Sequence, residues 1–167
     1  RVTLDNPDVR GREEILRVHA KGKPLAEDAN LKRVAQLTVG FSGADLANLI
    51  NEAAILTARR EKTLITADEF AESVDRVIAG PVRKSRVISD REKELTAYHE
   101  AGHALVAHLL PHADPVFKVS IVARGGMGGY TRYLPEEDRH IWTKNQFKDQ
   151  LAAALGGRVA EEIVFDE

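Results

Sequence analysis

The sequence predicts a mainly α-helical protein with a small β component, in which a helical domain precedes an α+β domain. Residues 1–80 combine helical spacing of apolar residues with helix-capping residues and few strand signals. Alternating apolar residues and a cluster of glycines, which are typical of a β-hairpin, follow residue 115. With 167 residues, 43% hydrophobic and 30% charged, the chain has the composition of a globular protein of one domain or two small ones.

Four helices are predicted in the first domain, after a strand end at residues 2–4. Ser42 with Asp45, and Thr66 with Glu69, have the spacing of capping boxes at helix starts. Gly80 followed by a proline is a helix stop signal. The expected helices cover about residues 9–19, 31–37, 43–60 and 67–78.

A short basic segment at residues 81–88 is predicted to be a linker between the domains, although an ordinary loop fits it as well. Ser89 with Glu92 then starts a helix that ends before Pro111. Its apolar positions predict a strong apolar face: Leu95, Tyr98, Ala101, Leu105 and Leu109. Gly102, which lies between alanines, predicts that another backbone packs closely against this helix.

A hairpin and further helical sequence are expected after the proline. The strand Phe117–Ala123, a turn at the glycines of residues 125–129 and a returning strand Tyr130–Leu134 form the hairpin. The glycines lack the strand-before, helix-after context of a phosphate-binding loop. Helix is predicted over Thr143–Leu155, and again over Arg158–Val164 after two glycines.

His99-Glu100-Ala101-Gly102-His103 is an HExxH motif within the predicted helix. Histidines four positions apart lie on one helix face, where both can bind a single Zn²⁺. Glu100 can then act as a general base on a zinc-bound water, as in peptide hydrolysis. The alternative is that His99 and His103 are ordinary polar-face histidines.

A third zinc ligand is required for a catalytic site, and the residues leave it open. Val106 and Leu109 exclude the metzincin pattern. The chain has no cysteine, which excludes thiolate ligands and disulfides. The remaining candidates are Glu136, Glu161, Glu162, His108, His112 and Asp114.

Charge and hydropathy exclude other classes. The net charge of −2 and the pI of about 6.3, with mixed signs along the chain, give no reason to expect nucleic-acid binding. No apolar run has the length of a membrane span, and no signal-peptide pattern opens the sequence. No G-x-x-x-x-G-K-[ST] motif for triphosphate binding occurs.

Three segments resemble a known family. GFSGADLANL at residues 40–49 resembles the long helix of an AAA+ ATPase lid domain. TAYHEAGHA at 96–104 and GGRVAEE at 156–162 are similar to the peptidase domain of FtsH, a family of membrane-anchored, ATP-dependent zinc proteases. The resemblance implies a helical AAA+ lid at residues 1–80, a linker at 81–88 and the N-terminal part of a zinc peptidase domain at 89–167.

The resemblance also implies site residues. His99 and His103 would be zinc ligands, Glu100 the general base, and the third ligand an Asp expected downstream of Glu167. His19, Gly43 and Ala44 match positions near the nucleotide, although a helix face and a helix start need no ligand. The fragment itself would then be inactive, without the third ligand and the phosphate-binding loop.

The implied function is that of an ATP-dependent zinc metalloendopeptidase that unfolds and degrades membrane and cytosolic proteins. It would use Zn²⁺ together with ATP and Mg²⁺, and would assemble as a homo-hexamer at the cytoplasmic face of the cell inner membrane. The strand Phe117–Ala123 could bind unfolded peptide by strand addition, or could be an internal strand. The alternative function is a nucleotide-responsive lid and assembly module with a structural, catalytically incomplete peptidase portion.

Overall fold

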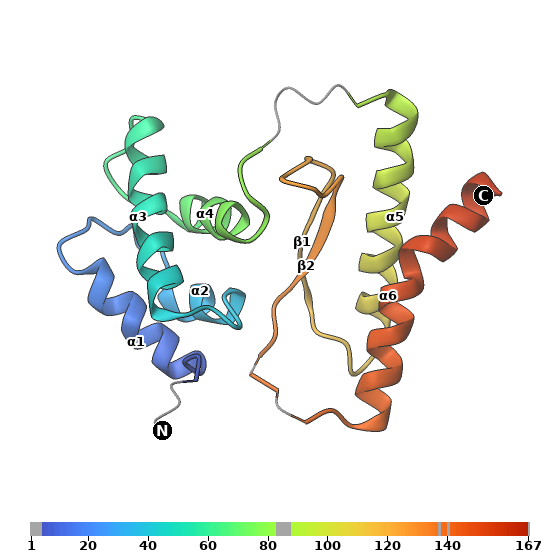
Figure 1. The fold of residues 1–167 in the computed structure, drawn as a ribbon, viewed down its shortest axis with the longest axis horizontal. Coiled ribbons are helices and arrows are strands. Elements are labelled where there is room, and N and C mark those ends of the chain that lie inside the picture. Colours follow the sequence, from blue (N-terminus) through green and yellow to red (C-terminus); the bar gives the residue numbers. More distant parts are fainter. Residues whose placement is uncertain (1–4, 83–87, 137, 140, 167) are drawn as a thin grey trace. The chain divides into compact units, whose positions relative to one another are not determined.

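The computed structural model describes residues 5–82, 88–136, 138–139 and 141–166, which form two compact units, Arg1–Gly80 and Pro81–Glu167 (Figure 1). The described elements are helices and one two-stranded sheet, which confirms the mainly α fold with a small β component. The predicted strand end at 2–4 and residues 83–87 of the predicted linker lie outside the described residues.

The first unit contains four helices: α1 (Val9–Ala20), α2 (Leu31–Leu37), α3 (Gly43–Arg59) and α4 (Ala67–Ala79). Helix α1 packs against α2 and α3, and α3 packs against α4. Both predicted capping boxes are present, at Ser42 and at Thr66, so local chemistry fixes where α3 and α4 begin. Gly80 ends α4 with φ +83°, a conformation that favours glycine.

An apolar core holds the four helices together. Its fully or almost fully buried side chains come from all four helices and from the segment before α4: Leu16, Val34, Ala35, Leu46, Leu49, Ile50, Ala53, Ile65, Phe70 and Val74. Two carboxylates of α4, Glu69 and Asp75, are buried beside them. Glu69 accepts hydrogen bonds from Arg60 (2.6 Å), Lys62 (2.9 Å) and the Thr66 hydroxyl, so its charge is compensated.

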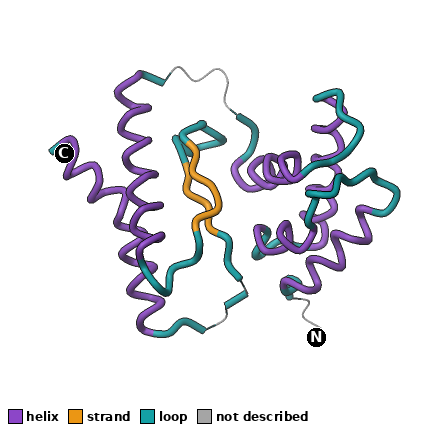
Figure 2. The backbone as a smooth tube through the Cα atoms, turned by 180° about the vertical axis from the view of Figure 1, so that it is seen from behind, coloured by secondary structure: helices purple, strands orange, loops and turns teal. Residues whose placement is uncertain are grey.

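The second unit contains helix α5 (Asp90–Leu109), strands β1 (Val116–Ser120) and β2 (Tyr130–Tyr133), and helix α6 (Lys144–Phe165). The strands are antiparallel, and α5 lies between this hairpin and α6 (Figures 1 and 2). Ser89 and Thr143 cap the two helices. The unit therefore has three layers, with the HExxH helix in the middle.

The hairpin and the last helix differ from their predictions. Strand β1 ends at Ser120, so the prediction that the strand continues to Ala123 was wrong; Ile121 and Val122 are exposed and Arg124 pairs with Met127 in the turn. The two predicted helical segments at the end of the chain are one helix, α6, which runs through both glycines. Intrahelical hydrogen bonding outweighs the cost of two glycines, which is about 1 kcal/mol each.

The predicted strong apolar face of α5 was also wrong. Tyr98 is 43%, Leu105 60% and Leu109 70% exposed, whereas Glu100, Gly102 and Ala107 are the buried residues of this helix. The close approach predicted at Gly102 is confirmed. A Cβ added there would lie 2.3 Å from the carbonyl oxygen of Gly156, so the α5 and α6 backbones meet at this point.

Within the described residues, no helix combines the length and apolar character required to cross a bilayer.

Candidate metal centre

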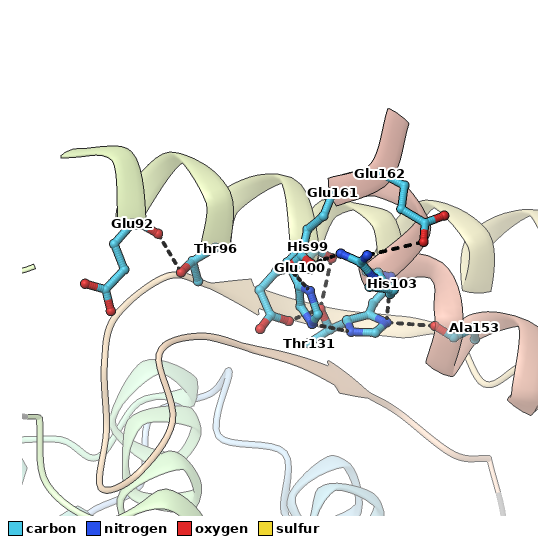
Figure 3. A network of polar contacts seen from close by, with 11 residues as sticks. Glu92, Thr96, His99, Glu100, His103, Thr131, Ala153, Glu161 and Glu162 are labelled. Carbon is cyan, nitrogen blue, oxygen red and sulfur yellow. Dashed lines mark hydrogen bonds and ion pairs between the residues drawn. The ribbon is translucent and has the colours of Figure 1, made fainter. Parts of the chain in front are cut away.

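His99 and His103 lie on one face of α5, one turn apart, as their spacing requires. Their Nε2 atoms approach each other to 2.9 Å, and their rings meet edge to face with centroids 4.5 Å apart (Figure 3). Both side chains are partly buried between α5 and α6. The structure therefore brings together the two residues that the sequence predicted as zinc ligands.

The other nitrogen of each ring is held by an oxygen of α6. His99 Nδ1 lies 2.7 Å from Glu161 Oε1, and His103 Nδ1 lies 2.7 Å from the carbonyl oxygen of Ala153. A carbonyl oxygen and an ionised carboxylate only accept hydrogen bonds, so each Nδ1 carries the proton. The Gly157 amide is also 3.3 Å from His103 Nδ1, but the shorter contact to Ala153 requires Nδ1 to be the donor.

This tautomer leaves a lone pair on each Nε2, and the two Nε2 atoms lie 2.9 Å apart with no proton between them. Such an arrangement is unfavourable for two neutral imidazoles alone and favourable when both bind one cation. Zinc binds imidazole nitrogen at about 2.0–2.1 Å, and zinc-bound histidines usually donate Nδ1–H to a carboxylate or a backbone carbonyl. Both features fit Zn²⁺, which His99 and His103 could hold through their Nε2 atoms.

Glycines give the two rings their space. A Cβ at Gly157 would lie 2.6 Å from His103 Nε2 and 2.7 Å from His99 Cε1, so any side chain there would displace both imidazoles. The neighbouring Gly156 is the residue whose backbone meets Gly102. The glycine pair inside α6 therefore has two separate functions, the helix contact and the ring space.

Glu100 lies on the hairpin side of α5 and is only 7% exposed. The Thr131 hydroxyl of β2 lies 2.8 Å from its Oε2 atom and 3.1 Å from its backbone carbonyl oxygen (Figure 3). Burial, and then the negative charge of Glu100, raise the pKa of Tyr133, which keeps this phenol protonated. A carboxylate, a hydroxyl and a phenol thus gather on the hairpin side of α5.

The candidates for a third ligand do not complete the pair. Among the described residues, no group of three or more His, Cys, Asp or Glu side chains could hold a metal ion. Glu161 contacts the Nδ1 side of His99, away from Nε2, and Glu162 lies 3.4 Å from Arg158. The others lie elsewhere: His112 contacts Asp149, Asp114 contacts Arg139, and His108 and Glu136 are exposed.

The residues predicted near a nucleotide lie in the first unit. His19 is exposed in the last turn of α1. Gly43 and Ala44 are the first two residues of α3, and a Cβ at Gly43 would lie 4.0 Å from the Ile15 side chain, one turn before His19. The three residues therefore belong to two helices in contact.

Sequence reasoning did not identify Thr131, Ala153 or Gly157 as part of the site. Ala153 contributes only its backbone, which no sequence pattern marks. The two adjacent glycines within one helix were a usable signal, because glycine is unfavourable there unless another atom must come close.

The chain is similar to known proteins along nearly its whole length. Residues 86–167 match peptidase family M41, and residues 28–72 match the AAA+ lid domain. The ATP-dependent zinc metalloprotease FtsH 1 of Sphaerobacter thermophilus is 69% identical over 166 residues, which are 99% of this chain and 25% of that protein. FtsH 1 of Thermomicrobium roseum is 67% identical over 99% of the chain and 26% of its own length. FtsH of Pseudothermotoga lettingae is 58% identical over 100% of the chain and 27% of its own length.

The chain thus spans about a quarter of the length of these relatives. The match extends along nearly all of its residues and includes both units. The chain belongs to the FtsH family of ATP-dependent zinc metalloproteases.

Proposed function

We propose that this chain is the lid and the metal-binding part of an ATP-dependent zinc metalloendopeptidase. The observation that carries the proposal is the pair of Nε2 atoms 2.9 Å apart, with a hydrogen-bond acceptor at each Nδ1 atom. The proposed domains are the AAA+ lid at residues 1–80, a linker at 81–88 and the N-terminal part of the peptidase domain at 89–167.

His99 and His103 would hold the zinc ion through Nε2. A third ligand, an Asp that follows residue 167 in the longer protein, is proposed from the family resemblance. Bound zinc would polarise the scissile carbonyl and lower the pKa of a bound water. Glu161 and the Ala153 carbonyl keep both Nε2 atoms deprotonated and aimed at one point.

Glu100 would act as the general base and then the general acid. Its Oε2 atom is hydrogen-bonded to Thr131, which leaves Oε1 to accept the proton of the attacking water. The same oxygen would deliver that proton to the leaving amine nitrogen when the peptide bond breaks. The burial of Glu100 limits competition from bulk water for this carboxylate.

The remaining roles also follow from the family. ATP with Mg²⁺ would be bound by the ATPase module, with His19, Gly43 and Ala44 of the lid near the nucleotide. We propose protein substrates, unfolded or membrane-bound, no nucleic-acid partner, a homo-hexamer, and a location at the cytoplasmic face of the inner membrane. The hairpin would bind unfolded peptide by strand addition, and peptide binding that survives substitution of Val119 and Ile121 by Pro would contradict this role.

Metal content tests the proposal directly. The full-length protein is expected to hold one zinc per chain, His103→Ala to lose it, and Glu100→Gln to keep it while losing proteolysis. His108→Ala is the matched control, since it removes an exposed histidine from the same helix and should change neither quantity. Zinc retained by His103→Ala would contradict the assignment.

The alternative is a nucleotide-responsive lid and assembly module whose peptidase portion is only structural. It is favoured by one observation: no third ligand lies among the described residues. Full-length protein that binds nucleotide, holds no zinc and cleaves no protein would establish this alternative instead.

A further inference from the structure

We propose that Thr131 is a positioning residue for the general base: its hydroxyl fixes the orientation of the Glu100 carboxylate. The inference rests on the proposed function of Glu100. It assigns a role in the reaction to strand β2, whose Thr131 lies 31 residues after Glu100 in the chain.

The Thr131 hydroxyl contacts both the carboxylate and the backbone carbonyl oxygen of Glu100. Thr131 Oγ1 lies 2.8 Å from Glu100 Oε2 and 3.1 Å from the Glu100 carbonyl oxygen. A hydroxyl has a single proton to donate, and the shorter contact is to the charged acceptor, which makes the stronger bond. The Glu100 side chain is therefore tied to a group that also contacts its own backbone, and this restricts its side-chain torsions.

Burial makes this bond hard to replace. Glu100 is 7% exposed, so little water reaches its carboxylate when the Thr131 hydroxyl is removed. The Tyr133 phenol, whose pKa is raised first by burial and then by the Glu100 charge, makes no hydrogen bond to Glu100 among the described residues. A carboxylate without Thr131 would therefore turn toward other partners, away from a productive orientation.

The hairpin fixes the position of Thr131 itself. Thr131 pairs with Val119 across the two strands. Two residues before Thr131, a Cβ at Gly129 would lie 2.8 Å from the Ser120 carbonyl oxygen and 3.0 Å from Glu100 Cγ. The backbone just before β2 therefore packs closely against α5 at Glu100, the proposed general base. The orientation of the Glu100 side chain thus depends on the hairpin.

The first test compares Thr131→Val, Thr131→Ser and Thr96→Val in the full-length protein. Valine has nearly the shape of threonine and suits a strand, so only the hydroxyl is lost. Thr96→Val is the matched control, because the Thr96 methyl group lies against the same hairpin at Gly129 while its hydroxyl donates to the Glu92 carbonyl oxygen, 2.8 Å away.

We expect Thr131→Val to keep its zinc and to lower kcat about 10- to 100-fold, with KM changed less than about twofold. Thr131→Ser should restore kcat to within about threefold of the wild-type value, and Thr96→Val should have the wild-type kcat and KM. Overturning results are a kcat of Thr131→Val within about twofold of the unchanged protein, a rise in KM alone, or loss of zinc.

A second test needs no activity. Melting temperatures of the metal-free protein are compared for Thr131→Val, Glu100→Ala and the double variant. If the two side chains interact, the double variant melts no lower than Glu100→Ala alone, because the bond is already lost. Fully additive losses would overturn the inference. A protein without zinc or peptidase activity would contradict the proposed function, and the melting test would still decide whether Thr131 holds Glu100.

Discussion

The two units of the chain are stabilised in different ways. The first unit buries large apolar side chains, such as Leu16, Ile50 and Phe70, from every helix. In the second unit, the buried hydrophobic residues among those described are alanines: Ala107, Ala123 and Ala153. Its larger apolar side chains are half-buried or exposed, and the exposed ones include a row at every fourth position of α6: Phe147, Leu151, Leu155, Val159 and Ile163.

The first unit is therefore organised around an apolar core, whereas the second is organised around the contacts of the histidine pair and of Glu100. Small residues and hydrogen bonds set the geometry between α5, α6 and the hairpin, and the apolar row of α6 contributes little to it. A single exposed apolar residue is ordinary, but a continuous row on one helix is typical of a surface that another part of a protein covers.

The largest effect should come from the core of the first unit. Phe70→Ala is expected to destabilise that unit by about 3–5 kcal/mol, because Phe70 is 1% exposed and its loss leaves a cavity. Leu155→Ala, at a residue 60% exposed, should cost less than about 0.5 kcal/mol. Urea unfolding followed by far-UV circular dichroism measures both, and equal losses would contradict the contrast.

Substitution of glycine by alanine should destabilise the second unit more than the first. Gly102→Ala is expected to destabilise the second unit by about 2–3 kcal/mol, because its Cβ would meet the Gly156 backbone, which has no flexible side chain to move. The matched control is Gly43→Ala at the start of α3, where the nearest side-chain atom is 4.0 Å away and the change should stay within about 1 kcal/mol.

Tryptophan fluorescence separates the two units in this experiment, because the single tryptophan, Trp142, belongs to the second. A fluorescence transition unchanged by Gly102→Ala would contradict the predicted backbone contact.

The smallest effect is a pH dependence confined to the first unit. Burial acts to raise the pKa of Glu69, but hydrogen bonds from Thr66, Lys62 and Arg60 outweigh it and lower the pKa from 4.5 to about 2. The folded unit therefore binds this proton less readily than the unfolded chain, so the stabilisation is complete above about pH 5 and is lost as the pH falls toward 2.

Because Arg60 and Lys62 are 40% and 42% exposed, the stabilisation should be only about 1–2 kcal/mol. Unfolding free energies measured between pH 3 and 7 should show a smaller pH slope in Glu69→Gln. Asp68→Asn, an exposed acid in the same helix turn, is the control. A slope that Asp68→Asn reduces as much as Glu69→Gln does would contradict the role of Glu69.

Local chemistry explains which parts of the fold could be predicted from the sequence. Ser42 and Thr66 interact with residues three positions later, so the helix starts were predictable. His99 and His103 share a face for the same reason. The orientation of α5 was not predictable from its apolar spacing, because its buried side is chosen by Gly102 against Gly156 and by Glu100 against Thr131, contacts between residues distant in sequence.

The adjacent glycines of α6 have a mechanical consequence. Gly156 sets how closely the two helices cross, while the next residue, Gly157, and the Ala153 carbonyl one turn earlier face the His103 ring. Any movement that separates α5 from α6 at this crossing would also lengthen the hydrogen bond between His103 Nδ1 and the Ala153 carbonyl oxygen. The affinity of the histidine pair for a metal ion would then depend on the distance between α5 and α6. It would therefore respond to strain that reaches this helix crossing from distant parts of the molecule.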